Sequence, residues 1–165
     1  MTAPAITVPK SPKEKTGGLT YFPRMLDKIR LKAAGTLGVG YQENYGKGVD
    51  GWCTDFLRVS HAELEKRVAD GGTDEEILEW CQAQGRSLNR TDIVVWNQFV
   101  LKLGWNDIAT KVLDRQKAEA GLSERVDILT LADFMDVDEG VGSEPVEKTQ
   151  DLSCRMGEHT VRSGP

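Results

Sequence analysis

The sequence predicts an all-α fold: a compact bundle, irregular or orthogonal in its packing, of roughly six to seven short helices. Three observations favour this class. Apolar residues recur at the i, i+3, i+4 and i+7 spacing of one helix face in successive segments, and the sequence contains no sustained strand alternation. Helix-start residues precede several of these segments, and glycines follow them. The connecting segments differ in length, which disfavours a simple up-and-down bundle.

The totals of the sequence point to one soluble domain rather than to a nucleic-acid-binding or membrane protein. The chain has 165 residues and a net charge of −5, whereas a nucleic-acid surface needs a basic face. No apolar run approaches the ~20 residues of a membrane span. We expect a flexible segment over residues 1–17, a single helical domain over 18–140 and a disordered tail over 141–165, where aromatic residues are absent.

Cysteine and histidine usage indicates a reduced, cytoplasmic protein. Cys53, Cys81 and Cys154 are widely and irregularly spaced, which gives no disulfide framework. We interpret Cys53 and Cys81 as packing thiols rather than nucleophiles, because Cys81 shares a helix face with Ile77 and Trp80. The first residues lack the apolar region of a secretory signal, and we predict no resident cofactor.

Residues 18–35 form the first predicted helix, with Pro23 in its first turn and Gly35 as its C-cap. One face is apolar and is expected to pack inward. The other face carries Arg24, Asp27 and Lys28, and we favour interpreting it as a solvated lattice of ordinary i, i+3 ion pairs. The alternative is an anion site, with Arg24 and Lys28 one turn apart near the positive end of the helix.

Residues 36–51 form a long loop with glycines at positions 38, 40, 46, 48 and 51. The loop matches neither a phosphate-binding loop, because the spacing from Gly40 to Gly46 is one residue too long, nor a dinucleotide fingerprint, because no strand precedes it. Long loops in compact domains are often functional. We therefore expect a binding site to use the polar side chains of this loop: Tyr41, Asn44, Tyr45 and Lys47.

Three further helices are predicted between residues 52 and 85. A short helix covers residues 52–59, and capping boxes formed by Ser60 with Glu63 and by Thr73 with Glu76 open the next two helices. Gly71 and Gly72 end the first of these capped helices, and Gly85 ends the second.

The segment 89–104 is predicted to be the helix around which the chain packs. Apolar residues cover most of its circumference, so we expect neighbours on most of its sides. Asn97 falls inside the apolar arc, between Ile93 and Leu101. A buried amide without partners costs about 1–3 kcal/mol, so Asn97 must be hydrogen-bonded. We favour a structural amide that bonds backbone atoms over a ligand contact at the floor of a pocket.

Two last helices are predicted over residues 107–120 and 125–137, and the second runs into an acidic end. Asp136, Asp138 and Glu139 are weak candidates for metal ligands, because their spacing lacks the pattern of a calcium loop, and we predict no metal site. Negative charge is unfavourable at a helix C-terminus. A salt bridge would compensate it as well as a metal ion would, and three cations could supply one: Arg24, Lys28 or Arg125.

The sequence contains, in order, the blocks SPKEKTGGLTYFPRMLDKIRLKAAGTL, NYGKGVDGWCTDFL, DEEILEWC, GRSLN, VVWNQFVLKLGWND and DFMDVDEG. These blocks resemble a bacterial family of unknown function, the domain of unknown function five-zero-six-nine. The resemblance covers about residues 11–140 and implies a small helical domain without an established activity. Family members continue from the last block with an arginine where this chain has Val141, which puts that block in doubt as an intact site and marks the tail as foreign to the family pattern.

We expect the protein to bind a small anionic metabolite and leave acid–base catalysis open. Arg24 and Lys28 are expected to hold the anion together with Asn44 and Lys47, and Asn97 to orient the ligand. The candidate catalytic groups are Tyr41, Tyr45 and Asp27.

The alternative function is a protein–protein interaction or adaptor domain without catalysis. It would use exposed aromatic side chains such as Trp52 or Trp105, and a homodimer is one form that it could take.

Overall fold

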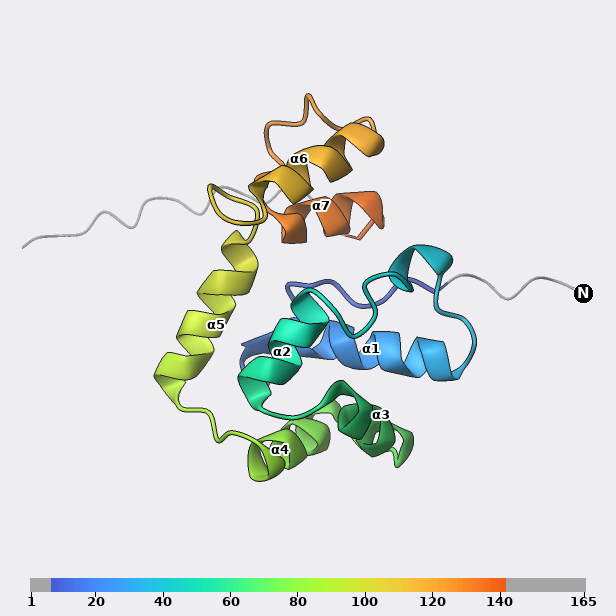
Figure 1. Ribbon diagram of the computed structural model, residues 1–165, viewed down its shortest axis with the longest axis vertical. Helices are drawn as coiled ribbons and strands as arrows, with labels where there is room; N and C mark the ends of the chain where they lie inside the picture. Colours follow the sequence, from blue (N-terminus) through green and yellow to red (C-terminus); the bar gives the residue numbers. More distant parts are fainter. Residues whose placement is uncertain (1–6, 142–165) are drawn as a thin grey trace, which may run out of the picture.

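Seven α-helices, one short 3-10 helix and one β-hairpin make up the described part of the chain, residues 7–141 of a computed structural model (Figure 1). The hairpin strands are β1 (Lys15–Thr16) and β2 (Leu19–Thr20). The helices are α1 (Phe22–Ala33), η1 (Val39–Tyr41), α2 (Val49–Leu57), α3 (His61–Ala69), α4 (Asp74–Gln84), α5 (Arg90–Lys102), α6 (Thr110–Glu119) and α7 (Leu131–Asp138). The predicted all-α class is confirmed, with the two-residue strands as its exception.

The helix starts follow the capping signals of the sequence. Both predicted capping boxes form: Ser60 accepts from the Glu63 N–H, and Thr73 accepts from the Glu76 N–H. The predicted start of the last helix at residue 125 is wrong, because a further capping box fixes it at Leu131. There the Thr130 side chain accepts from the backbone N–H of Asp133.

The core consists of two clusters that α5 connects. The larger cluster lies among α1–α5, and α1 fills its centre with Phe22, Met25 and Leu26, which are fully buried. The smaller cluster joins the end of α5 to α6 and α7. Figure 1 shows the same division: α6 and α7 lie together at one end of the molecule, and α5 spans the distance to the other helices.

The hairpin is held against α5 by two side chains. Gly17 and Gly18 form its turn with φ of 54° and 82°, the left-handed conformations that a two-residue hairpin loop of this kind needs. Trp96 Nε1 donates to the Thr20 carbonyl at 2.8 Å. The Asn97 Oδ1 atom accepts from the Thr20 N–H at 2.9 Å, and Nδ2 donates to the Gly18 carbonyl at 2.8 Å. The structure thus places Asn97 in the structural role that the sequence favoured.

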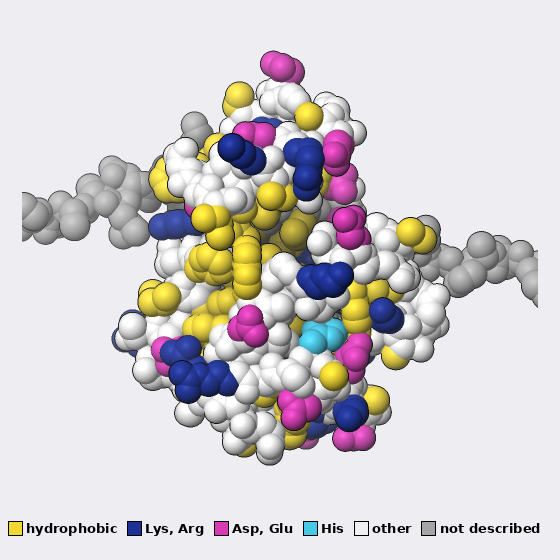
Figure 2. Space-filling view, viewed as in Figure 1, with side chains coloured by type: hydrophobic (Ala, Val, Ile, Leu, Met, Phe, Trp, Pro, Cys, Tyr) yellow, Lys and Arg dark blue, Asp and Glu magenta, His cyan; other side chains and the backbone are white. Residues whose placement is uncertain are grey.

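The expected cover around α5 is wrong. Within the helix only Trp96 and Val100 are buried, whereas Val94, Val95 and Phe99 are 51%, 60% and 39% exposed. The physical reason is the position of α5 along one side of the molecule, where one face packs on the hairpin and another is left open (Figure 1). Figure 2 shows hydrophobic side chains gathered on this open face, over α2 and α5.

The segment before the hairpin packs into the domain. Residues up to 17 were expected to be flexible, yet Pro9, Ser11, Pro12 and Thr16 are buried. The predicted tail beyond residue 141 lies outside the described residues. None of the helices in residues 7–141 has the length and apolar character that crossing a membrane requires.

Replacement of Asn97 tests its structural role. Asn97→Ala removes both hydrogen bonds to the hairpin, and we expect the free energy of unfolding in urea to fall by about 1–2 kcal/mol. The matched control is Gln98→Ala, an exposed amide on the same helix, with an expected change within about 0.5 kcal/mol. Equal effects of the two substitutions would contradict the assigned role.

Candidate functional site

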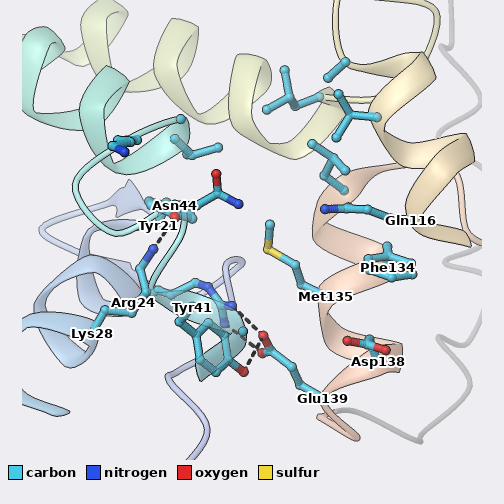
Figure 3. Close-up of a pocket in the computed structure, with 18 of the residues that line it drawn as sticks. Tyr21, Arg24, Lys28, Tyr41, Asn44, Gln116, Phe134, Met135, Asp138 and Glu139 are labelled. Carbon is cyan, nitrogen blue, oxygen red and sulfur yellow. Dashed lines mark hydrogen bonds and ion pairs between the residues drawn. The ribbon is translucent and has the colours of Figure 1, made fainter. Parts of the chain in front are cut away.

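A cavity of about 420 Å³ lies where α1 and the loop 36–48 face α6 and α7 (Figure 3). One wall is polar and comes from α1 and the loop: Tyr21, Arg24, Lys28, Tyr41, Asn44 and Lys47. The other wall is mainly apolar and comes from α2 and α5–α7: Val49, Trp52, Leu103, Val112, Phe134 and Met135. Glu139 reaches across from the end of α7 to the polar wall.

Arg24 is buried and holds a carboxylate of the protein itself. Its side chain is 3% exposed, with Nη1 donating to Glu139 Oε2 at 2.8 Å and Nη2 to Oε1 at 2.5 Å. Nη1 also donates to the Lys10 carbonyl at 2.8 Å. Burial acts to lower the pKa of Arg24, but the hydrogen bonds and charge of Glu139 raise it above its ordinary value. Arg24 therefore stays charged in its buried position.

Lys28 is the second buried cation and is paired inside the domain. Its Nζ lies 2.6 Å from Asp50 Oδ1 and donates to the Tyr21 hydroxyl at 3.2 Å, and that hydroxyl donates to the same Asp50 oxygen at 2.9 Å. Asp50 is fully buried, and its other oxygen accepts from the Gly46 N–H at 3.1 Å. Burial lowers the pKa of Lys28 although the charge of Asp50 acts to raise it.

The favoured solvated lattice on this helix face is therefore wrong for Arg24 and Lys28. Their cover comes from segments that are distant in the sequence. The carboxylates of Asp50 in α2 and Glu139 after α7 neutralise them. Of the two alternatives that could compensate the acidic helix end, the salt bridge is present, as the pair of Arg24 with Glu139.

Tyr21 adopts a backbone conformation that is uncommon for an aromatic residue. It precedes α1 as its N-cap with φ 76° and ψ −26°, in the left-handed region. Such conformations cost about 1–3 kcal/mol and persist where the surrounding structure fixes them. Here they direct the Tyr21 hydroxyl to Asp50 and Lys28 at the polar wall of the cavity.

Among the other predicted site residues, the loop side chains divide between two locations. Asn44 and Lys47 are exposed and line the cavity. Tyr41 also lines it and donates to Glu139 Oε1 at 2.9 Å. Tyr45 points elsewhere: its hydroxyl donates to Glu65 at 2.5 Å, and its ring lies edge-on to His61.

Asp27, Asn97 and Asp136 lie outside the cavity, whereas Asp138 and Glu139 line it. Asp27 accepts from the Lys10 N–H at 3.2 Å and pairs with Arg30. Asp136 accepts from the Ser11 hydroxyl at 2.7 Å, and Asp138 alone of this aspartate pair lines the cavity. Within residues 7–141, no group of three or more His, Cys, Asp or Glu side chains is arranged to hold a metal ion.

The sequence interpretation missed Tyr21, Asp50 and Gln116. Asp50 had a usable signal, because it precedes Cys53, Thr54 and Leu57 at the i+3, i+4 and i+7 positions of the buried face of α2. Tyr21 and Gln116 had none. Two buried polar atoms at the cavity have no hydrogen-bond partner in the described residues, namely Arg24 Nε and Gln116 Oε1.

The model of a family described as "Domain of unknown function (DUF5069)" matches residues 6–141. This range includes both walls of the cavity and ends where the predicted tail begins. A search of curated proteins finds no match to the chain.

The three tyrosines provide a test of this buried network by pH titration. Burial raises the pKa of each above 10.0, with added contributions from Asp50 for Tyr21 and from Glu65 for Tyr45. For Tyr41, burial and Glu139 raise the pKa to about 12. The folded state therefore loses stability as the pH rises from 10.0 towards 12, because only the unfolded chain ionises easily in that window.

We expect the ultraviolet absorbance of tyrosinate to stay low in the folded protein at pH 10.0 and to rise towards pH 12. The control is the same titration in denaturant, where the midpoint should lie near pH 10. Tyr41→Phe should remove the component with the midpoint of about 12. Ionisation of any tyrosine of the folded protein with an ordinary midpoint would contradict the network.

Proposed function

The chain belongs to the DUF5069 family, and we propose that it binds a small anionic molecule in the cavity between α1, the glycine-rich loop and α6–α7. The observation that carries this proposal is the buried guanidinium of Arg24 in the polar wall, opposite an apolar wall. The cavity volume of about 420 Å³ falls in the range of small-molecule sites. A polar anchor with an apolar surround is the usual composition of such sites.

The charged groups around the opening support an anionic ligand. Lys47 and Arg115 line the cavity as exposed side chains, and they outnumber Asp138, the one exposed carboxylate of its lining. Asn44 adds an amide that can donate to a bound oxygen, and it points towards the cavity in Figure 3. Asn97 is no longer part of the proposed site, since both of its polar atoms bond the hairpin backbone.

Of the three candidate groups for acid–base chemistry, Tyr41 is the one that lines this cavity. Its pKa of about 12 keeps it protonated at neutral pH, so it can donate a proton or a hydrogen bond to a ligand. Tyr45 and Asp27 lie outside the cavity and take no part in the proposed chemistry.

Filling the cavity tests the proposed binding. Arg24→Ala is unsuitable, because breaking a buried ion pair costs about 3–5 kcal/mol of stability. We choose Val112→Trp, which adds an indole at the apolar wall, and the matched control Val126→Trp, at an 85% exposed position away from the cavity. Native mass spectrometry of protein purified gently from its own host should show a small anionic molecule retained by the wild type and by Val126→Trp. The Val112→Trp variant should lose it.

A bound mass that Val112→Trp retains would place the ligand elsewhere. Wild-type protein that is empty, and that also fails to gain thermal stability with a panel of carboxylates and phosphates, would contradict the proposed binding altogether.

A second candidate function, self-association, is favoured by the open apolar face. A groove there is lined by Asp55 and by six apolar residues: Trp52, Phe56, Val95, Trp96, Phe99 and Ile108. Val95 is 60% and Ile108 is 79% exposed, and contiguous exposed apolar surface commonly marks an interaction site. Trp105, the other aromatic candidate, is 54% exposed but does not line this groove.

Light scattering coupled to size exclusion separates this candidate from the first. We expect a dimer for the wild type and a monomer for Val95→Asp, with Val126→Asp as the control that keeps the dimer. A wild type that remains monomeric at high concentration would contradict self-association through this face.

A further inference from the structure

Arg24 displays the geometry of a carboxylate-binding site whose present occupant is Glu139. The two terminal nitrogens of Arg24 meet the two oxygens of Glu139, at 2.8 and 2.5 Å, in the parallel fork that suits a planar carboxylate. Tyr41 donates a third hydrogen bond to the same group, at 2.9 Å (Figure 3). A ligand carboxylate could take the same three donors.

Glu139 stands at the end of a helix, where its side chain can move without a change in the packing of the core. It caps the C-terminus of α7, a helix of 8 residues, and Gly140 follows it with φ 67°. The last turn of a helix opens at low free-energy cost, and the carbonyl end of the helix disfavours a negative charge. Release of the Glu139 side chain therefore leaves the core packing of α7, through Leu131 and Phe134, in place.

The charges of the wall specify how much charge the ligand brings. Asp50 neutralises Lys28 at 2.6 Å. Because Asp50 does not line the cavity, a ligand does not reach it, and the pair stays intact when the ligand binds. Departure of Glu139 leaves one buried positive charge, that of Arg24, without a partner. A single negative charge restores neutrality of the buried wall, whereas a dianion such as a phosphate monoester places a surplus charge in a buried site, which is unfavourable. The other charged side chains of the lining, Lys47, Arg115 and Asp138, are exposed, so water and salt screen their charges.

The opposite wall specifies the rest of the ligand. Leu103, Val112, Phe134 and Met135 line the cavity, and Met135 extends towards the polar wall in Figure 3. An apolar body lying against them removes apolar surface from water, which is the main favourable contribution to binding of this kind. A small, strongly hydrated anion leaves that surface uncovered.

We propose that the ligand class of this cavity is a hydrophobic monocarboxylate, which binds Arg24 and Tyr41 by displacing Glu139. The inference rests on the proposed function of the same cavity and adds the chemical class of the ligand and an internal competitor. Glu139 keeps the site closed to weakly binding anions, because every ligand must first replace it.

Calorimetric titration of the full chain tests the displacement, with hexanoate as the probe. Glu139→Gln removes the competing charge at nearly constant size and should bind hexanoate about tenfold more tightly than the wild type, or better. The control is Asp138→Asn, which removes the same charge one residue away, from a side chain that lines the cavity but does not touch Arg24. We expect it to change the affinity by less than about twofold. Hexanamide, the neutral analogue, should bind weakly to all three proteins.

Chemical rescue gives a second measurement that does not depend on tight binding. Glu139→Ala leaves Arg24 buried without its partner, so its Tm should fall below that of the wild type. Acetate should restore much of the lost Tm, and acetamide at the same concentration should not. Equal effects of acetate and acetamide would overturn the idea that the vacated site recognises a carboxylate.

The remaining outcomes separate this inference from the proposed function. Equal hexanoate affinity in the wild type and Glu139→Gln, or an equal gain in Asp138→Asn, overturns the displacement. Tighter binding of hexyl phosphate than of hexanoate to Glu139→Gln overturns the monocarboxylate class. Neither result contradicts ligand binding in the cavity. That proposal is tested separately, by the comparison of Val112→Trp with Val126→Trp, and it is contradicted only if no ligand occupies the cavity.

Discussion

The burial of two cations one turn apart on α1 is the constraint on which much of this structure depends. Arg24 and Lys28 lie on the same side of a helix whose other residues fill the centre of the larger core cluster. Each buried charge needs an opposite charge, because an unpaired one costs several kcal/mol. The partners come from different elements, Asp50 from α2 and Glu139 from the end of α7. One helix face thus connects the first half of the domain to its last helix.

The same constraint explains why a cavity exists at this position. α7 packs its apolar side chains on α5 and α6, within the smaller core cluster, and meets the polar wall through the long side chain of Glu139. The ion pair of Arg24 with Glu139 holds α1 and α7 farther apart than direct apolar contacts would. The space beside it is therefore lined by charged groups on one side and by the apolar residues of α6 and α7 on the other.

Local signals in the sequence predicted the capped helix starts, because the interactions that start and end a helix lie within a few residues. The boxes at Ser60 and Thr73 are examples, and the error at residue 125 arose from overlooking the same kind of box at Thr130. The first helix, predicted from residue 18, begins only at Phe22, since Leu19 and Thr20 form β2. The candidate site was only partly predictable. Arg24, Lys28, Tyr41, Asn44 and Lys47 do meet at one cavity, but spacing along α1 could not distinguish a solvated lattice from buried pairs. Their burial is decided by Asp50 and Glu139, which are far away in the sequence.

In α5, too, spacing along the helix could not decide which residues are buried. Its wide apolar arc indicated a fully covered helix, yet the arc serves two purposes: Trp96 and Val100 enter the core, while Val95 and Phe99 form an open face. Asn97 lies between these surfaces, and its amide bonds the backbone of Thr20 in β2 and of Gly18 in the hairpin turn. The polar residue in the apolar arc of α5 thus supports the hairpin, whereas the charged residues of α1 line the cavity. The distinction rests on the partner. Backbone groups bond both polar atoms of Asn97. The charge of Arg24, in contrast, is neutralised by a single side chain at a helix end, and such a partner can be exchanged.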